Sequence, residues 1–331
     1  MPAQTVRVTL RCNHGCVFCF AEWCLPQRRR DVHDYTNVIG DDWRSELDEV
    51  RAAGYDELSI SGGEPLLHPE LVPMVRHAKA LGFSRIEVQT NASLMTTRNV
   101  ARLRAAGMTA SMASLPSHVP RAFDAITRTK GHFQASVDGI RNLLRARVEV
   151  ILCHVICAGN YRLLPDYVRF ADETLHGINE ILFFYVQPEG RAARNPRLFP
   201  RLTSLRPRWL SAMSEADRLG LYFRTDTQTG LPLCYMTGHE DRLKLIDLLD
   251  PRAVFGTDVS SFEYMQGNKR KAPACGTCFF DPVCFGFWKT YLEAHGDGEL
   301  RPVPEDARLR ALFPAVVERH ARRGTGHGEG A

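Results

Sequence analysis

Three cysteines lie close together in the stretch Arg11-Cys12-Asn13-His14-Gly15-Cys16-Val17-Phe18-Cys19, with three residues between the first two and two between the last two. The preceding residues 5–10, Thr-Val-Arg-Val-Thr-Leu, predict a strand because β-branched side chains favour extended backbone. The thiols therefore fall in the loop at the C-terminal end of that strand. Three thiolates on one tight loop can hold three corners of a 4Fe–4S cube, which ordinarily takes four cysteines. The fourth iron is left open for another ligand, which is the layout of a reaction centre.

The spacing Cys-x3-Cys-x2-Cys, with an aromatic residue just before the last cysteine, resembles the radical S-adenosylmethionine (radical SAM) enzymes. The resemblance implies that Cys12, Cys16 and Cys19 hold a 4Fe–4S cluster whose open iron binds S-adenosylmethionine. It also implies that cleavage of this cofactor yields a 5′-deoxyadenosyl radical, and that Phe18 lies against the adenine. A zinc site is the alternative, but such sites usually show two Cys-x2-Cys or Cys/His pairs, which this loop lacks.

The composition is that of a globular protein with metal or redox chemistry. A chain of 331 residues, 44% hydrophobic and 24% charged, can fill one large or two smaller cores. No apolar stretch has the length of a membrane span or a signal peptide, so we expect a cytoplasmic protein without a membrane partner. Ten cysteines in that compartment indicate metal binding more than disulfides.

The charge balance is mild and predicts no nucleic-acid partner. The formal net charge is +4, and the one basic run near the cysteine loop is Arg28-Arg29-Arg30. Such a run is usually a solvated loop, and the sharper alternative is a clamp for a phosphate or carboxylate. We expect the loop 20–34 to become ordered when substrate and cofactor bind.

Strands and helices alternate through the first two thirds of the chain. The strands are expected at 5–10, 57–61, 86–90, 109–114, 148–156 and 180–186, and the helices at 41–53, 71–81, 97–106, 134–145, 164–174 and 208–219. Short apolar strands alternating with longer helices predict βαβ units and a parallel sheet. Six units are too few for a closed eight-fold barrel, so the fold class is α/β, a partial (β/α)6 TIM-type barrel. The radical SAM resemblance implies the same fold.

The regular alternation stops near residue 220. A further strand is expected at 221–225, irregular polar stretches at 229–251 and 255–273, and helices at 285–294 and 305–322. We therefore predict a barrel domain over 1–220, a small C-terminal α+β iron–sulfur domain over 221–323, and a disordered Gly-rich tail over 324–331.

The second expected strand runs into Gly62-Gly63-Glu64-Pro65, at the same rim as the cysteine loop. Glycines at a strand end let the backbone approach a ligand closely. In radical SAM enzymes this tetrapeptide binds the methionine amine of the cofactor, which implies cofactor-binding roles for Gly62, Gly63 and Glu64. Taken alone, the tetrapeptide is an ordinary strand-to-helix turn.

Three further residues resemble cofactor-binding positions of the family at the ends of the next strands. Asn91, at the end of Gln89-Thr90-Asn91, would approach the ribose and methionine parts of S-adenosylmethionine. Ser114 ends the fourth strand, and Arg128 follows it, although the basic position of the family aligns equally well with Thr127. The alternative for each is a capped turn or a packed side chain.

A second group of cysteines lies beyond the barrel. Cys275-x2-Cys278-x5-Cys284, with the distant Cys234, provides four thiols, and Gly276 eases the turn between the first pair. Zinc held by four cysteines is the ordinary interpretation of such a set. Beside the N-terminal motifs, the set resembles a Twitch domain, the shorter relative of SPASM, and implies one auxiliary 4Fe–4S cluster. Without Cys234 that cluster would keep an open iron.

The remaining cysteines are Cys24, Cys153 and Cys157. Buried thiols in a core strand are common, which is the ordinary interpretation of Cys153. Cys157 lies nearer the catalytic rim and is a candidate hydrogen donor to a substrate radical, as some epimerising relatives require. Four residues follow the sixth strand and either line a substrate pocket or begin a polar loop: Tyr185, Gln187, Glu189 and Arg191.

We expect an enzyme that acts on a small molecule, a sugar- or nucleoside-containing biosynthetic intermediate. Only eleven residues precede Cys12, which leaves no room there for a peptide-binding module. The alternative is a maturase of ribosomally made peptides that recognises its substrate through a separate protein. From another class, the chain could be a non-catalytic iron–sulfur carrier or a zinc-bearing binding module. The radical SAM resemblance implies a flavodoxin- or ferredoxin-type electron donor, and the net reaction (oxidation, epimerisation or bond formation) stays open.

Overall fold

The central feature of the fold is one parallel sheet of seven strands in chain order. The structure, a computed structural model, describes residues 3–19, 39, 42–225, 230–243 and 266–325. The strands are β1 (Ala3–Thr9), β2 (Glu57–Gly62), β3 (Arg85–Thr90), β4 (Ala110–Ser114), β5 (Glu149–Ile156), β6 (Glu180–Tyr185) and β7 (Phe223–Thr225). Each strand pairs in parallel with the next. Among the described residues β1 and β7 are the sheet edges, so the barrel is open.

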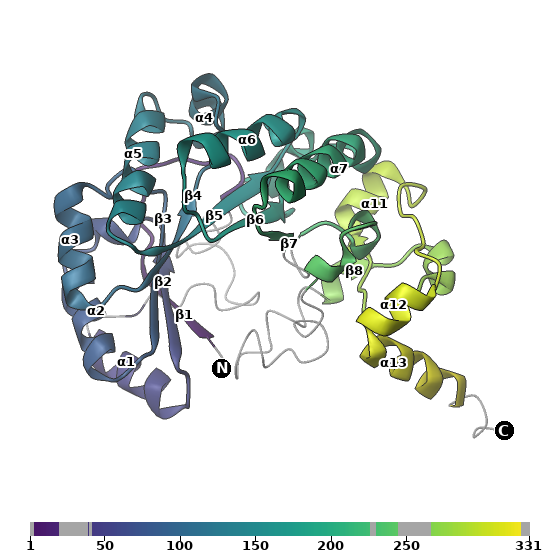
Figure 1. Ribbon diagram of the computed structural model, residues 1–331, viewed down its shortest axis with the longest axis horizontal. Coiled ribbons are helices and arrows are strands. Elements are labelled where there is room, and N and C mark those ends of the chain that lie inside the picture. Colours follow the sequence, from purple (N-terminus) through teal and green to yellow (C-terminus); the bar gives the residue numbers. More distant parts are fainter. Residues whose placement is uncertain (1–2, 20–38, 40–41, 226–229, 244–265, 326–331) are drawn as a thin grey trace.

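Helices cover the outer face of the sheet, as Figure 1 shows. They are α1 (Trp43–Ala52), α2 (Leu71–Ala80), α3 (Thr97–Ala106), α4 (Pro120–Thr127), α5 (His132–Arg145), α6 (Leu164–Thr174) and α7 (Leu202–Leu219). The prediction of a partial α/β barrel is confirmed. None of the helices that the structure describes has the length and apolarity needed to cross a bilayer.

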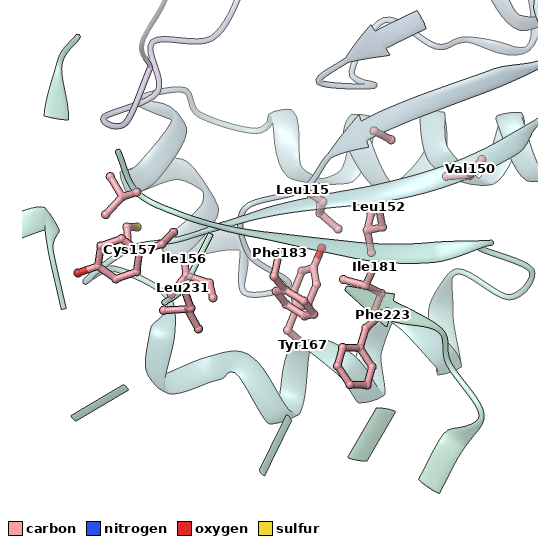
Figure 2. Close-up of a cluster of buried hydrophobic side chains, with 14 of the residues drawn as sticks. Leu115, Val150, Leu152, Ile156, Cys157, Tyr167, Ile181, Phe183, Phe223 and Leu231 are labelled. Atoms are coloured by element: carbon pink, nitrogen blue, oxygen red, sulfur yellow. The ribbon is translucent and has the colours of Figure 1, made fainter. Parts of the chain in front are cut away.

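Apolar side chains from the strands and helices form the core between these two layers. Figure 2 shows the part under β4 to β7, where Leu152, Phe183 and Phe223 meet Tyr167 of α6. Trp209 of α7 is fully buried, and its ring lies 5.2 Å from that of Phe183 in an edge-to-face arrangement. Burying each side chain of this size stabilises the fold by about 1.5–3 kcal/mol.

The other face of the sheet, away from the helices, is polar near β2 and β3. Because side chains alternate between faces, Ser59 and Ser61 share a face with Glu87 and Gln89. Ser59 Oγ donates to Glu87 Oε1 at 2.8 Å, and Gln89 Nε2 donates to Ser59 Oγ at 2.9 Å. Ser61 Oγ donates to Gln89 Oε1 at 2.7 Å. The concave side of the barrel is therefore lined here by a connected row of hydrogen-bonding groups.

Two helices differ from the sequence expectation. α4 is not predicted because it has only eight residues, although Pro120 at its start and the three-residue spacing of its buried Phe123 and Ile126 are typical of a helix. α7 begins at Leu202, before Pro207, although proline usually ends a helix. Its first turn is held by tertiary contacts, since the Leu202 amide donates to Tyr291 Oη at 2.8 Å.

The residues beyond β7 form a small α+β segment beside α7 (Figure 1). It contains the antiparallel pair β8 (Lys269–Arg270) and β9 (Phe287–Trp288), followed by α11 (Lys289–His295), α12 (Ala307–Leu312) and α13 (Pro314–Thr325). The helix expected at 285–294 starts later because 287–288 pair as a strand. The helix expected at 305–322 is divided at Pro314. β7, beyond residue 220, still belongs to the barrel sheet, and α13 reaches past 324; residues 326–331 of the expected tail lie outside the described chain.

A buried carboxylate, Glu299, connects this segment to the barrel. It is 4% exposed and accepts hydrogen bonds from Arg201 Nε at 3.0 Å, from Thr203 and from Tyr291 Oη. Burial raises the pKa of Glu299, but these hydrogen bonds more than offset it, so the pKa lies below its ordinary value. Tyr235 Oη also donates to the Glu299 carbonyl at 2.9 Å. The start of α7 and the C-terminal segment are thus joined through one side chain.

We predict that Gly139→Ala destabilises the barrel. An added Cβ in α5 would lie 1.9 Å from the Ala92 carbonyl oxygen, in the turn after β3. Overpacking of this kind costs about 1–3 kcal/mol, more than the ~1 kcal/mol that alanine gains over glycine in a helix. The free energy of unfolding, measured in urea by circular dichroism, should fall. Gly298→Ala, with no atom within 4 Å of the added Cβ, is the control and should change stability little; equal stability of the two variants would contradict the prediction.

Candidate active site and metal centre

The cysteine loop follows β1 directly, at the strand's C-terminal end, as expected. Cys12 is exposed, and Cys16 and Cys19 are partly exposed. The loop is bound to the end of α4, because the Gly15 amide donates to the Thr127 carbonyl at 2.8 Å and the Val17 amide to the Ile126 carbonyl at 2.9 Å. Its position is therefore set by main-chain contacts with a helix more than a hundred residues away in the sequence.

Gly62 and Gly63 lie against the backbone that leads into this loop. The Gly63 amide donates to the Thr9 carbonyl at 2.6 Å, and the Glu64 amide donates to the Arg11 carbonyl at 2.8 Å. A Cβ on Gly62 would lie 2.3 Å from Thr9 O, and one on Gly63 would lie 2.2 Å from Arg11 O. Contact with the chain's own cysteine loop thus requires both glycines, a reason that the sequence alone does not show.

Glu64 is fully buried, and its carboxylate accepts hydrogen bonds within the protein. Oε1 accepts from Thr90 Oγ1 at 2.8 Å and from the Leu66 amide at 3.2 Å, and Oε2 accepts from the Asn91 amide at 2.9 Å. Burial raises the pKa of Glu64, and these hydrogen bonds oppose the rise. The carboxylate joins the end of β2 to the end of β3.

Asn91, predicted from the sequence to approach S-adenosylmethionine, reaches the cysteine loop. Its Nδ2 donates to Asn13 Oδ1 at 2.7 Å and approaches Cys12 Sγ at 3.9 Å. Asn13 Nδ2 in turn donates to Ser93 Oγ at 2.9 Å. Asn13 and Ser93 were not among the predicted site residues, and only the pairing of distant strands reveals their role.

The thiols of the loop lie close together, and Cys16 is more shielded from water than the exposed Cys12. Burial raises the pKa of Cys12, and burial together with Cys19 and Cys12 raises the pKa of Cys16 to about 12, while the Arg191 guanidinium opposes the rise. Thiolates bind metals and thiols do not, so a positively charged group must compensate three such neighbours. The donor set therefore fits a multiply charged iron–sulfur cluster.

The other predicted cofactor-binding residues are Ser114, Phe18 and Arg128. Ser114 ends β4, on the strand-end side of the sheet, and is partly exposed. Phe18 is partly buried against the core. Arg128 is exposed, with a left-handed backbone (φ 53°), and its Cβ lies 3.5 Å from where Gly15 would carry one. Arg128 thus packs beside the backbone of the loop.

Cys157 is fully buried, and burial raises its pKa to about 11. Figure 2 places it at one end of the apolar core cluster, next to Ile156. A thiol without exposed surface does not favour the hydrogen-donor role, which stays an expectation. Cys153 is partly exposed.

The four residues at the end of β6, expected either to line a substrate pocket or to begin a polar loop, have different surroundings. Tyr185 is fully buried and its Oη donates to the Pro200 carbonyl at 2.8 Å, and Glu189 is 4% exposed. Arg191 contacts the cysteine loop, and Gln187 is partly exposed. The predicted residues Cys24 and Arg28 to Arg30, and the loop 20–34, lie outside the described residues.

The four C-terminal cysteines line one small pocket that is open on one side. Cys234, from the turn after β7, joins the local group Cys275, Cys278 and Cys284. Burial raises the pKa of Cys234 to about 12, with further contributions from the other three thiols, and the Arg301 main chain opposes the rise. The distant cysteine, the least secure member from sequence, is therefore brought to the other three.

Main-chain amides point at the sulfurs of this pocket. The Gly286 amide donates to Cys284 Sγ at 3.3 Å, and the Val303 amide donates to Cys278 Sγ at 3.3 Å. Gly286 has φ 82°, and a Cβ there would lie 2.0 Å from the Arg270 carbonyl oxygen, so only glycine fits. Amide–sulfur hydrogen bonds of this kind are typical of iron–sulfur sites. In the described part of the chain, no three His, Cys, Asp or Glu side chains converge as they would around a single metal ion.

A family model, curated proteins and solved structures match this chain. The model of the Radical SAM superfamily matches residues 6–173. GTP 3',8-cyclase of Peptoclostridium acidaminophilum is 30% identical over 196 residues, covering 57% of this chain and 56% of that protein. Fe-coproporphyrin III synthase of Methanosarcina barkeri is 24% identical over 193 residues, covering 58% of this chain and 46% of that protein. This chain spans about half the length of these curated relatives.

Two solved structures share the fold. The structure of anSMEcpe with bound AdoMet has a TM-score of 0.60 at 15% identity and covers 97% of this chain and 98% of its own. Streptococcus suis SuiB bound to precursor peptide SuiA has a TM-score of 0.53 at 18% identity and covers 68% of this chain and 49% of its own. At such identities the likeness concerns the fold alone.

We predict that Gly63→Ala displaces the cysteine loop. The added Cβ would overlap the Arg11 carbonyl and push Arg11 and Cys12 away from β2. Cys16 would then lose the burial that raises its pKa, so its alkylation by iodoacetamide in the metal-free protein should become several-fold faster. Mass spectrometry of the modified peptides measures this rate. Gly298→Ala serves again as the control, and an unchanged Cys16 rate in Gly63→Ala would show that the close contact is dispensable.

Proposed function

The chain belongs to the radical SAM superfamily, and we propose that it is an enzyme that binds a 4Fe–4S cluster through Cys12, Cys16 and Cys19. When bound, the cluster and S-adenosylmethionine supply a 5′-deoxyadenosyl radical that can take hydrogen from a substrate. The single observation that carries this proposal is that the cysteine loop, the Gly62–Gly63 backbone and Asn91 meet at one rim of the barrel. A non-catalytic electron carrier would not need this arrangement around an open iron.

The residues of this rim have distinct proposed roles. The main chain at Gly62 and Gly63 and the side chain of Asn91 would bind the polar end of S-adenosylmethionine, with Ser114 and Phe18 farther along. Glu64 acts by orientation, because both of its oxygens already accept hydrogen bonds from Thr90, Leu66 and Asn91. Arg128 supports the loop from the side of α4.

We propose a second 4Fe–4S cluster at Cys234, Cys275, Cys278 and Cys284, in a Twitch-like domain over residues 221–323. Support comes from the pocket that all four line and from the amides that donate to Cys278 and Cys284. Lys271, Asp281 and Arg301 also line it, and Lys271 Nζ pairs with Asp281 Oδ1 at 2.8 Å. The two cations outnumber the one carboxylate, and positive charge suits an anionic cluster with four thiolates. Four cysteine ligands leave no open iron, so this group would transfer electrons or stabilise the fold. A flavodoxin- or ferredoxin-type protein is the proposed electron donor.

The proposed substrate is a small polar molecule that contains a sugar or nucleoside. The row formed by Ser59, Ser61, Glu87 and Gln89 supports this, because hydroxyl and amide groups on the concave face can bind ribose-like hydroxyls. The similarity to a protein named GTP 3',8-cyclase agrees with a nucleotide-type substrate. The second candidate is a peptide maturase, favoured by the fold shared with SuiB bound to its precursor peptide. The net reaction is left open.

We predict that the reduced, reconstituted protein converts S-adenosylmethionine to 5′-deoxyadenosine. Chromatography of anaerobic reactions measures the product, and Cys16→Ala should abolish it by removing a cluster ligand. Nucleosides and nucleotide sugars should increase the yield above the substrate-free level, whereas an increase with peptides alone would favour the maturase. Product formation that survives in Cys16→Ala would contradict the cluster assignment.

We predict two clusters per chain, which means about eight iron and eight sulfide. Cys275→Ala/Cys278→Ala should lower the iron to about four per chain and keep the signal of the N-terminal cluster in electron paramagnetic resonance. Cys153→Ala is the matched control and should retain all the iron. About four iron together with stoichiometric zinc in the wild type would instead assign the second site to zinc.

A further inference from the structure

Arg191 is the residue that the structure places most unexpectedly. It follows β6 and is far from the cysteine loop in the sequence. Its main-chain amide donates to the Cys19 carbonyl at 3.1 Å, and its Nη1 donates to the Cys16 carbonyl at 3.2 Å. One residue thus bonds to the backbone of two of the three proposed cluster ligands.

The position of the Arg191 side chain is set from several sides. Its Nη1 lies 3.8 Å from where a Cβ on Gly15 would stand, so the guanidinium lies beside the backbone of the cysteine loop. The turn that carries Arg191 is closed by the Ala192 and Ala193 amides, which donate to the Glu189 carbonyl at 3.0 and 3.3 Å. Glu189 and Ala192 are buried, so this turn is anchored in the protein.

The charge of Arg191 has an electrostatic consequence. An arginine is always protonated in proteins, and a cluster with three thiolates becomes more negative when it accepts an electron. A positive charge at a fixed short distance favours the more negative state, and part burial weakens the screening by water.

We propose that Arg191 is a positioning residue whose charge, held on the Cys16 carbonyl, raises the reduction potential of the N-terminal cluster. The inference rests on the proposed cluster at Cys12, Cys16 and Cys19. It adds a determinant of how readily that cluster is reduced, from a segment outside both cysteine motifs. The role is distinct from ligation, because the guanidinium contacts the carbonyl oxygen of Cys16.

Two variants separate the charge from the hydrogen bond. Arg191→Gln keeps an N–H donor and removes the charge, whereas Arg191→Lys keeps the charge and loses the planar fork. Both retain the main-chain amide that donates to the Cys19 carbonyl. The matched control is Arg197→Gln, an exposed arginine on the next short helical turn.

The test is a redox titration of the full-length, reconstituted protein, followed by electron paramagnetic resonance. The N-terminal cluster is identified as the signal that changes when S-adenosylmethionine is added. In Arg191→Gln the ratio of reduced to oxidised cluster at the wild-type midpoint should fall about tenfold, which is about 59 mV for a one-electron couple. Arg191→Lys and Arg197→Gln should stay near the wild-type midpoint.

Each outcome of the titration either supports or overturns the proposal. A midpoint in Arg191→Gln equal to that of Arg197→Gln would overturn the proposal, as would equal loss of cluster iron from the Gln and Lys variants. Loss of cluster iron from Arg191→Gln alone would also overturn it, because Arg191 would then be needed to retain the cluster rather than to set its potential. A wild-type protein without any signal that responds to S-adenosylmethionine would instead refute the proposed function itself.

Discussion

The main-chain contact between Gly63 and Thr9 is the constraint on which the site depends. It brings the turn after β2 so close to the loop after β1 that no side chain fits between them. The Glu64 carboxylate then extends the connection to β3 through the Asn91 amide. Because the three strand ends are joined by backbone and buried hydrogen bonds, the cysteine loop has little freedom relative to the barrel rim. A cofactor that bridges the loop and the rim would therefore meet a preformed site.

A second junction attaches the C-terminal group of cysteines to the barrel. Glu299 accepts hydrogen bonds from the start of α7 and from Tyr291, and its carbonyl accepts one from Tyr235, the neighbour of Cys234. The segment that carries Cys234 is thereby attached to the same helix layer that covers β6 and β7. A buried carboxylate is costly to leave without partners, so this network favours one arrangement of the C-terminal segment on the barrel.

The sequence predicts the position of a helix or strand well where the element buries one apolar face. Strands β2 to β6 and helices such as α3 and α6 lie close to the expected positions, because each buries one continuous apolar face. α7 differs because its first turn depends on Tyr291 and Glu299, which follow it by about ninety residues. α4 differs because its eight residues contain a single helical repeat of buried side chains, Phe123 and Ile126. The sequence places Arg191 at the end of the sixth strand but does not predict its partners, which are the carbonyls of Cys16 and Cys19.

What the sequence by itself determined is the chemistry: three thiols spaced for an open cluster, a Gly-Gly-Glu-Pro turn at a strand end, and a parallel α/β order. These are patterns of neighbouring residues, so they can be recognised without the tertiary structure. Only the tertiary structure decided which distant groups meet them. It brought Cys234 to the C-terminal thiols, Asn13 to Asn91 and Arg191 to the cysteine loop. Such pairs depend on strand order and helix packing, which arise from the sum of many weak contacts. No single position of the sequence predicts them.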